Sequence, residues 1–114
     1  EAANSLRFIA QSYLAEQVEL AEAGIRISKL LDFLAVNEAQ RAQYRVFDEV
    51  HQRLKHIPIL QAWKDLPKKE KRSHMKLINE VENEFKDFAV DAAKTLSAFN
   101  LKQLEVKATF YSAA

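Results

Sequence analysis

Residues 75–99 read MKLINEVENEFKDFAVDAAKTLSAF, and apolar side chains recur there every three or four positions. An α-helix completes one turn in 3.6 residues, so this spacing places them on one face of a helix. The members of this apolar stripe are Ile78, Val81, Phe85, Phe88, Ala92, Leu96 and Phe99. Because three of them are phenylalanines with large surfaces to bury, the sequence predicts that this helix is the central helix of a bundle.

The composition favours helices elsewhere in the chain as well. Its 114 residues include one Gly and two Pro, too few for the many tight turns of a sandwich or barrel. Residues that favour helices dominate, and an apolar fraction of 48% is ordinary for a folded domain. The sequence therefore predicts an all-α fold in which residues 1–114 form a single domain.

The first long helix is predicted over residues 5–36, with Asn4 or Ser5 as its cap. Its apolar positions are Leu6, Ile9, Tyr13, Leu20, Ile27, Leu31 and Leu34. Gly24 lies in the same series although glycine in a helix costs about 1 kcal/mol relative to alanine. Gly24 is interpreted as a point of close approach where a neighbouring side chain fills the gap, and a kink or hinge is the alternative.

A second helix is predicted to begin at Asn37, which with Gln40 resembles a capping box. So short a connection folds it back antiparallel to the first helix, unless the two form one long kinked helix. Pro58 disfavours helical backbone just before it, so the helix should end near Ile57. Residues 59–66 then form a short helical segment, predicted to close one end of the bundle with Trp63 as its plug.

The third helix is predicted to be capped by Asp65, to carry Pro67 in its first turn and to continue through the apolar stripe. Beyond Phe99 we expect the helix to continue with a kink at Asn100, and a separate final helix is the alternative. The predicted architecture is three long helices in an up-down-up antiparallel bundle, with a short extra helical segment between the second and third.

The start of the third helix is unusually basic. Residues 67–76 contain five cations and one acid, whereas the whole chain has a net charge of only +1. The cations are Lys68, Lys69, Lys71, Arg72 and Lys76. Free backbone N–H groups at a helix start also attract anions, so this segment is a candidate contact for a phosphate-bearing surface or an acidic partner. Solubilising lysines at a solvated helix start are the alternative.

An acidic row follows the basic segment along the same helix. It consists of Glu80, Glu84, Asp87 and Asp91, spaced by four, three and four residues. Like charges at this spacing repel, so cations on a neighbouring helix, such as Arg41, Arg45 or Arg53, should offset them. The alternative is a contact site for a basic partner.

Some aromatic residues lie off the predicted stripes or near helix ends, and a three-helix bundle has too little interior for all of them. Those taken as a candidate apolar interface are Phe8, Tyr44, Phe110 and Tyr111. Unburied apolar surface usually marks contact with a partner or a second copy, so we expect a protein partner or a homo-oligomer.

The sequence nominates no catalytic, cofactor or metal site. It has no Cys, and His51 and His56 are five residues apart, which puts them on different faces of a helix. The single glycine leaves no phosphate-cradling loop. We therefore expect a non-enzymatic interaction module such as a scaffold, adaptor or assembly subunit, with binding of lipid head groups or nucleic acid through the basic segment as the alternative. No apolar run reaches the roughly 20 residues needed to span a bilayer, so a soluble protein is predicted, intracellular in preference to secreted.

Overall fold

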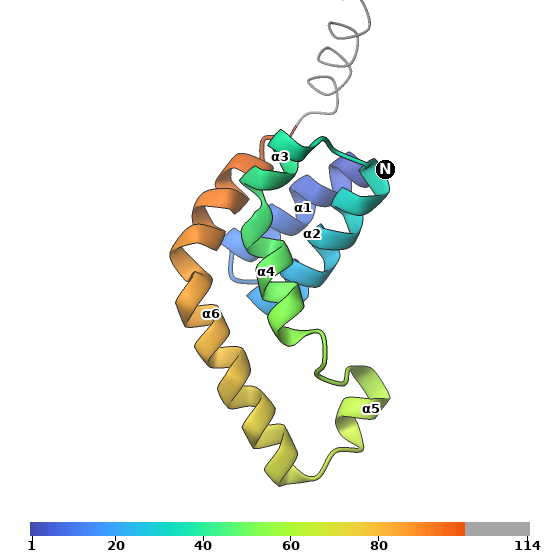
Figure 1. The fold of residues 1–114 in the computed structure, drawn as a ribbon, viewed down its shortest axis with the longest axis vertical. Coiled ribbons are helices and arrows are strands. Elements are labelled where there is room, and N and C mark those ends of the chain that lie inside the picture. Colours follow the sequence, from blue (N-terminus) through green and yellow to red (C-terminus); the bar gives the residue numbers. More distant parts are fainter. Residues whose placement is uncertain (100–114) are drawn as a thin grey trace, which may run out of the picture.

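The computed structural model describes residues 1–99, which form six α-helices and no strand (Figure 1). The helices are α1 (Ala2–Leu14), α2 (Leu20–Leu34), α3 (Glu38–Gln43), α4 (Arg45–Leu54), α5 (Leu60–Lys64) and α6 (Lys68–Leu96). The all-α prediction is confirmed. The predicted course of the chain beyond Phe99 lies outside the described residues.

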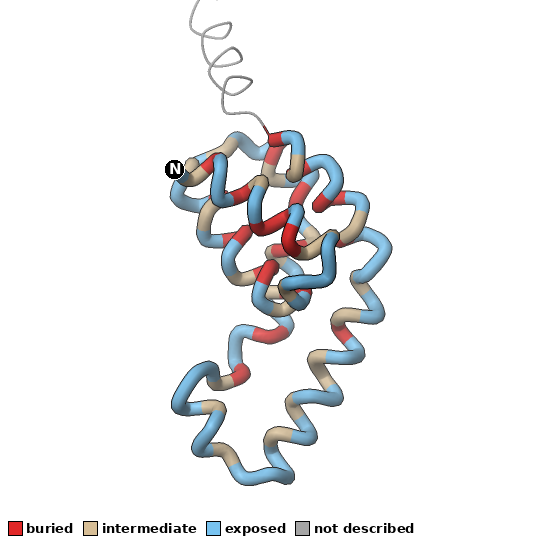
Figure 2. Tube along the Cα trace, turned by 180° about the vertical axis from the view of Figure 1, so that it is seen from behind, coloured by how far each residue is buried: buried red, intermediate tan, exposed pale blue. Residues whose placement is uncertain are grey.

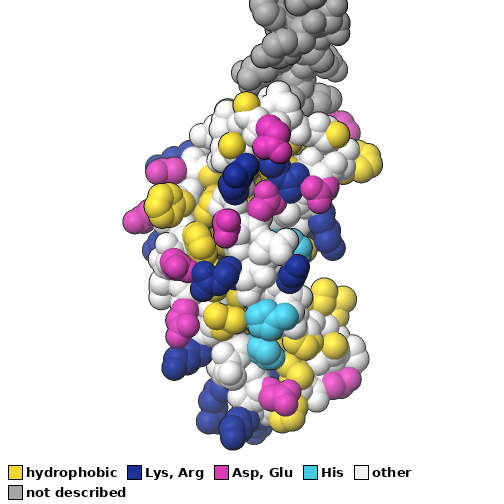
Figure 3. All heavy atoms as spheres, viewed as in Figure 1, with side chains coloured by type: hydrophobic (Ala, Val, Ile, Leu, Met, Phe, Trp, Pro, Cys, Tyr) yellow, Lys and Arg dark blue, Asp and Glu magenta, His cyan; other side chains and the backbone are white. Residues whose placement is uncertain are grey.

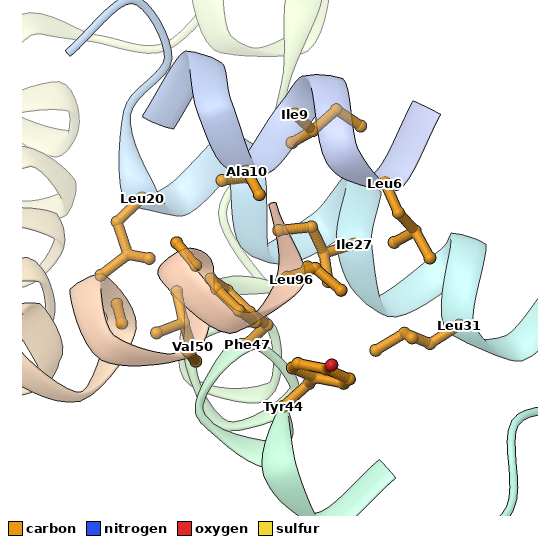
Figure 4. Close-up of a cluster of buried hydrophobic side chains, with 14 of the residues drawn as sticks. Leu6, Ile9, Ala10, Leu20, Ile27, Leu31, Tyr44, Phe47, Val50 and Leu96 are labelled. Carbon is orange, nitrogen blue, oxygen red and sulfur yellow. The ribbon is translucent and has the colours of Figure 1, made fainter. Parts of the chain in front are cut away.

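The hydrophobic core lies among α1, α2, α4 and the C-terminal half of α6. Figure 4 shows side chains from all four helices converging, with Phe47 and Leu96 near the middle. Both side chains are fully buried, as are Leu6 and Ile27. Four helices rather than three long ones therefore enclose the core.

Gly24 is a point of close approach between α2 and α4, as the sequence predicted. A Cβ atom at this position would lie 3.1 Å from Val50 Cγ1 and 3.3 Å from the carbonyl oxygen of Phe47. Helix α2 continues through Gly24 without interruption. Because Gly24 has no side chain, the backbone of α2 packs directly against the Val50 side chain of α4.

The single helix predicted over residues 5–36 is wrong, because the chain turns between α1 and α2. Glu16 adopts a left-handed backbone conformation with φ of 60°. The Glu16 N–H donates to the Tyr13 carbonyl and the Gln17 N–H to the Ser12 carbonyl, at 3.0 and 2.9 Å. These two bonds form a Schellman motif, which normally has glycine at the left-handed position. With glutamate there, the sequence carries no visible stop signal, and α2 folds back along α1 (Figure 1).

Helix α2 also ends on a left-handed residue that is not glycine. Ala35 has φ of 50° and ψ of 45°, a region that costs an L-residue roughly 1 kcal/mol or more. We expect Ala35→Gly to raise the free energy of unfolding by about 0.5–1 kcal/mol, because glycine adopts this conformation without steric cost. Urea denaturation measures the change. The same substitution at Ala42, inside α3, should lower stability instead, and an equal effect at both positions would contradict this explanation.

The second predicted helix is likewise divided, into α3 and α4. Its predicted start is confirmed, because the Asn37 side chain accepts a hydrogen bond of 2.9 Å from the Gln40 N–H. The helix breaks at Tyr44, whose φ of −114° is not helical. Tyr44 packs into the core at this point, so tertiary packing, rather than a helix-breaking residue, accounts for the division.

The apolar stripe of α6 is confirmed at Val81, Ala92, Leu96 and Phe99, which are buried. Phe88 is exposed, so its predicted burial is wrong. Ala89 and Ala93 are buried in its place. Their small side chains allow α6 to lie close to the helices it packs against, and this face turns Phe88 outward.

Residues 58–80 extend beyond the core, and we call them the arm. They comprise α5 and the first turns of α6, and Figure 2 shows almost all of them as exposed or intermediate. The prediction that this segment closes the end of the bundle is wrong, because α5 contains no buried residue and lies beyond the core, across from the first turns of α6 (Figure 1). Trp63 is only partly buried, against the edge of the core.

Candidate functional site

The main hollow of the arm is an apolar groove between the arm and the core, and we call it the arm groove. It has a volume of about 550 Å³, and ten of its twelve lining residues are apolar. Its arm side is formed by Pro58, Ile59, Leu60, Trp63, Met75 and Ile78. Its core side is formed by Ala21, Ile25, Leu54 and Ile57. A groove of this size and character is typical of sites that bind other molecules.

Several of these apolar side chains are open to solvent. Leu60 is 80% exposed, and Ile59 and Met75 are also exposed. Burying one such side chain stabilises a complex by roughly 1.5–3 kcal/mol. Singly exposed apolar residues are common, but exposed residues that line one groove point to a binding surface.

Contacts within the arm hold the wall of the groove in place. The ring of His74 lies near the rings of both His56 and Trp63, at centroid distances of 6.0 and 6.1 Å. This cluster joins the end of α4, α5 and α6. In addition, Lys71 Nζ donates a hydrogen bond of 3.0 Å to the carbonyl of Lys64, which connects α6 to the last residue of α5.

The predicted basic segment forms the tip of the arm, at the start of α6 (Figure 1). Its cations are exposed apart from Lys71, which is half-buried. Figure 3 shows dark blue side chains at this tip, below hydrophobic ones on the arm. The predicted cap is wrong: α6 is preceded by Pro67 without a side-chain cap, and Asp65 instead accepts a hydrogen bond of 2.9 Å from Gln61. The backbone N–H groups at this end therefore add to the positive potential of the tip.

The opposite side of the arm groove is acidic. Glu19 and Glu22 line it from the start of α2, and both are exposed. The arm therefore carries cations at its tip, whereas the core side of its groove carries carboxylates.

The predicted acidic row lies on the exposed surface of α6, away from the arm groove. All four of its residues are exposed. Of the three cations expected to offset it, Arg53 does so through an ion pair with Glu84 at 3.0 Å. Arg41 pairs with Asp32 and Asp48 and Arg45 with Glu38, so these two have other partners.

The structure divides the aromatic residues of the predicted interface. Phe8 is 66% exposed on α1, as that prediction requires. Tyr44 is only 4% exposed and belongs to the core, so it offers almost no surface to a partner. Phe110 and Tyr111 lie outside the described residues.

A second cleft, of about 610 Å³, lies between the turn that follows α1 and the middle of α6. Burial, and then the charge of Glu19, raise the pKa of Glu82 against a smaller opposing hydrogen bond from the Ala21 backbone. Burial and the Glu82 charge also raise the pKa of Tyr13. Within residues 1–99, no cluster of three or more metal-ligating side chains occurs.

No helix in the described part of the chain is long and apolar enough to cross a membrane. Residues 1–96 match the model of a protein family described as a protein of unknown function (DUF2489). The match runs from the start of α1 to the last residue of α6, and the chain belongs to this family. No curated protein and no solved structure matches the chain.

Proposed function

We propose that this member of the DUF2489 family is a non-enzymatic interaction module whose arm groove binds an acidic, amphipathic helix of a partner protein. The proposal is supported by the exposed apolar side chains that line a groove on the same arm that carries the basic tip. Amphipathic helices commonly bind by placing apolar side chains, spaced by three and four residues, into such grooves.

The charges around the groove specify the partner helix further. The tip carries five cations and one acid, so the exposed face of the partner helix should be acidic where it passes α6. Glu19 and Glu22 lie on the other side, so a basic residue is favoured there. This polarity gives the partner helix a preferred orientation in the groove.

We expect a labelled 20-residue peptide with leucines at helical spacing and glutamates on its other face to bind, as measured by fluorescence anisotropy. Leu60→Asn with Met75→Asp should weaken binding by about tenfold or more, since anchoring side chains usually carry most of the binding energy. Asparagine tolerates the positive φ of 55° at Leu60, so this change should preserve the local backbone.

Two controls make the result specific. Phe33→Asp removes an equally exposed side chain of α2 outside the groove and should leave affinity unchanged. A peptide with lysines in place of the glutamates should bind weakly. If the acidic peptide does not bind, or if Phe33→Asp weakens binding as much as the groove variants do, the proposal is wrong.

A second candidate function is binding to an anionic phosphate-bearing surface through the tip, because exposed Leu60 and Ile59 lie on the same arm as the cations. Because these two residues line a concave groove, the surface suits a helix better than a flat bilayer. Changing Lys68, Lys69, Lys71 and Arg72 to Gln should abolish sedimentation with phosphatidylserine vesicles at low salt if this function holds. Unchanged sedimentation would contradict it.

A further inference from the structure

We propose that the chain also associates with a second copy of itself, by placing Phe88 of one copy in a groove between α1 and α2 of the next. This contact uses none of the residues that line the arm groove.

The first half of the contact is Phe88, which is 68% exposed in the middle of α6. Asp87 and Asp91 lie one and three residues away on the same exposed surface. Figure 3 shows a hydrophobic side chain between acidic ones along the α6 edge of the molecule. Arg45 and Glu49 lie across the hollow that Phe88 lines with Asp91. An exposed aromatic residue flanked in sequence by Asp87 and Asp91 suits an apolar socket that carries cations.

The second half is the α1–α2 groove, which has a volume of about 580 Å³. Its apolar surface comes from Phe8, Ile9 and Leu30, and Phe8 is largely exposed. Arg26 and Lys29 also line this groove, and none of its lining residues is a carboxylate. The groove therefore offers apolar surface beside two cations, of which Arg26 also pairs with Glu22 at 3.6 Å.

Charge complementarity makes a second copy the favoured occupant. Asp87 and Asp91 of one chain would meet Arg26 and Lys29 of the next while Phe88 is buried between them. The residues that surround Phe88 are different from those that line the α1–α2 groove, so one chain can use both surfaces at once. Such a head-to-tail contact leaves one free surface at each end, so it produces rings or open chains rather than closed symmetric dimers.

Sedimentation velocity over a concentration series at low salt tests this contact. We expect the mass to rise above the 13.1 kDa of one chain and the association to weaken with added salt. Phe88→Ser and Lys29→Glu should each weaken self-association by about tenfold or more. Both residues are exposed, so neither change should unfold the chain.

Mixing the two variants gives the sharpest result. Each variant alone lacks one half of the contact, but the Phe88→Ser chain retains the groove that the Lys29→Glu chain's Phe88 requires. The mixture should therefore form pairs and no larger species. A chain that stays monomeric at every concentration, or an association that neither variant changes, would overturn the proposal. Binding of the acidic peptide should be unaffected by Phe88→Ser, so the two proposals can fail independently.

Discussion

Replacing Gly24 by leucine is expected to lower the free energy of unfolding by about 3 kcal/mol or more, because the buried contact between α2 and α4 has no room for a side chain. Even a Cβ atom would lie 3.1 Å from Val50 Cγ1 and 3.3 Å from the Phe47 carbonyl oxygen. Val50 and Phe47 are fully buried, so neither can move aside freely. A loss of this size is a large part of the 5–15 kcal/mol typical of a domain, and urea denaturation should show it as a lower midpoint.

Alanine at position 24 separates packing from helix propensity. Alanine favours the helix by about 1 kcal/mol relative to glycine, but its Cβ is crowded by Val50. In a Val50→Ala background the closest contact is removed, so Gly24→Ala should be more favourable there than in the natural chain by at least about 1 kcal/mol. Independent, additive effects of the two changes would contradict close approach at Gly24.

Asp48→Ala is expected to lower stability by about 2–3 kcal/mol, because its carboxylate joins α2, α3 and α4. It accepts hydrogen bonds from Nε and Nη2 of Arg41 at 2.8 and 2.7 Å and from Ser28 Oγ at 2.6 Å. Removing it leaves the half-buried Arg41 with Asp32 as its remaining ion-pair partner among the described residues. Glu38→Ala breaks an exposed ion pair with Arg45 at 3.7 Å and should change stability by less than about 0.5 kcal/mol.

The effect of Asp48→Ala should also depend on pH. Burial raises the pKa of Asp48, but hydrogen bonds from Arg41 and Ser28 and nearby positive charges outweigh burial, so the net pKa lies below its ordinary value of 3.8. The unfolded chain therefore binds this proton more tightly, and stability falls as pH decreases below about 4. The difference in free energy of unfolding between the natural chain and Asp48→Ala should have its full size above that pH and should become smaller below it. An equal difference at pH 3 and pH 7 would contradict this account.

The helical class, the cap at Asn37 and the close approach at Gly24 could all be predicted from the sequence, because each rests on local pattern or composition. The turn after α1 could not, because Glu16 takes the place that glycine usually marks. The buried face of α6 was only partly predictable. Phe88 and Ala89 are adjacent apolar residues, and the spacing alone does not decide which of them is buried. Close packing between helices favours burial of the smaller side chain, Ala89.

The basic tip was predictable as a cluster of charge, since its residues are consecutive in the sequence. The arm groove was not, because its two sides come from α2 and α4 on one hand and α5 and α6 on the other. Ile59 and Leu60 belong to the segment 59–66 that was predicted to close one end of the bundle. Only the position of the arm, displaced from the end of the bundle, shows that they are exposed.

Trp63 provides the most direct measurement of partner binding in the arm groove. It is the only tryptophan in the chain and it lines this groove, so its fluorescence reports on the groove alone. Titration with the acidic amphipathic peptide should shift the emission of Trp63 to shorter wavelength. The dissociation constant from this titration should equal the one measured by anisotropy. Leu60→Asn with Met75→Asp should suppress both signals together. An unchanged Trp63 emission at peptide concentrations that saturate binding would place the peptide elsewhere and contradict the account.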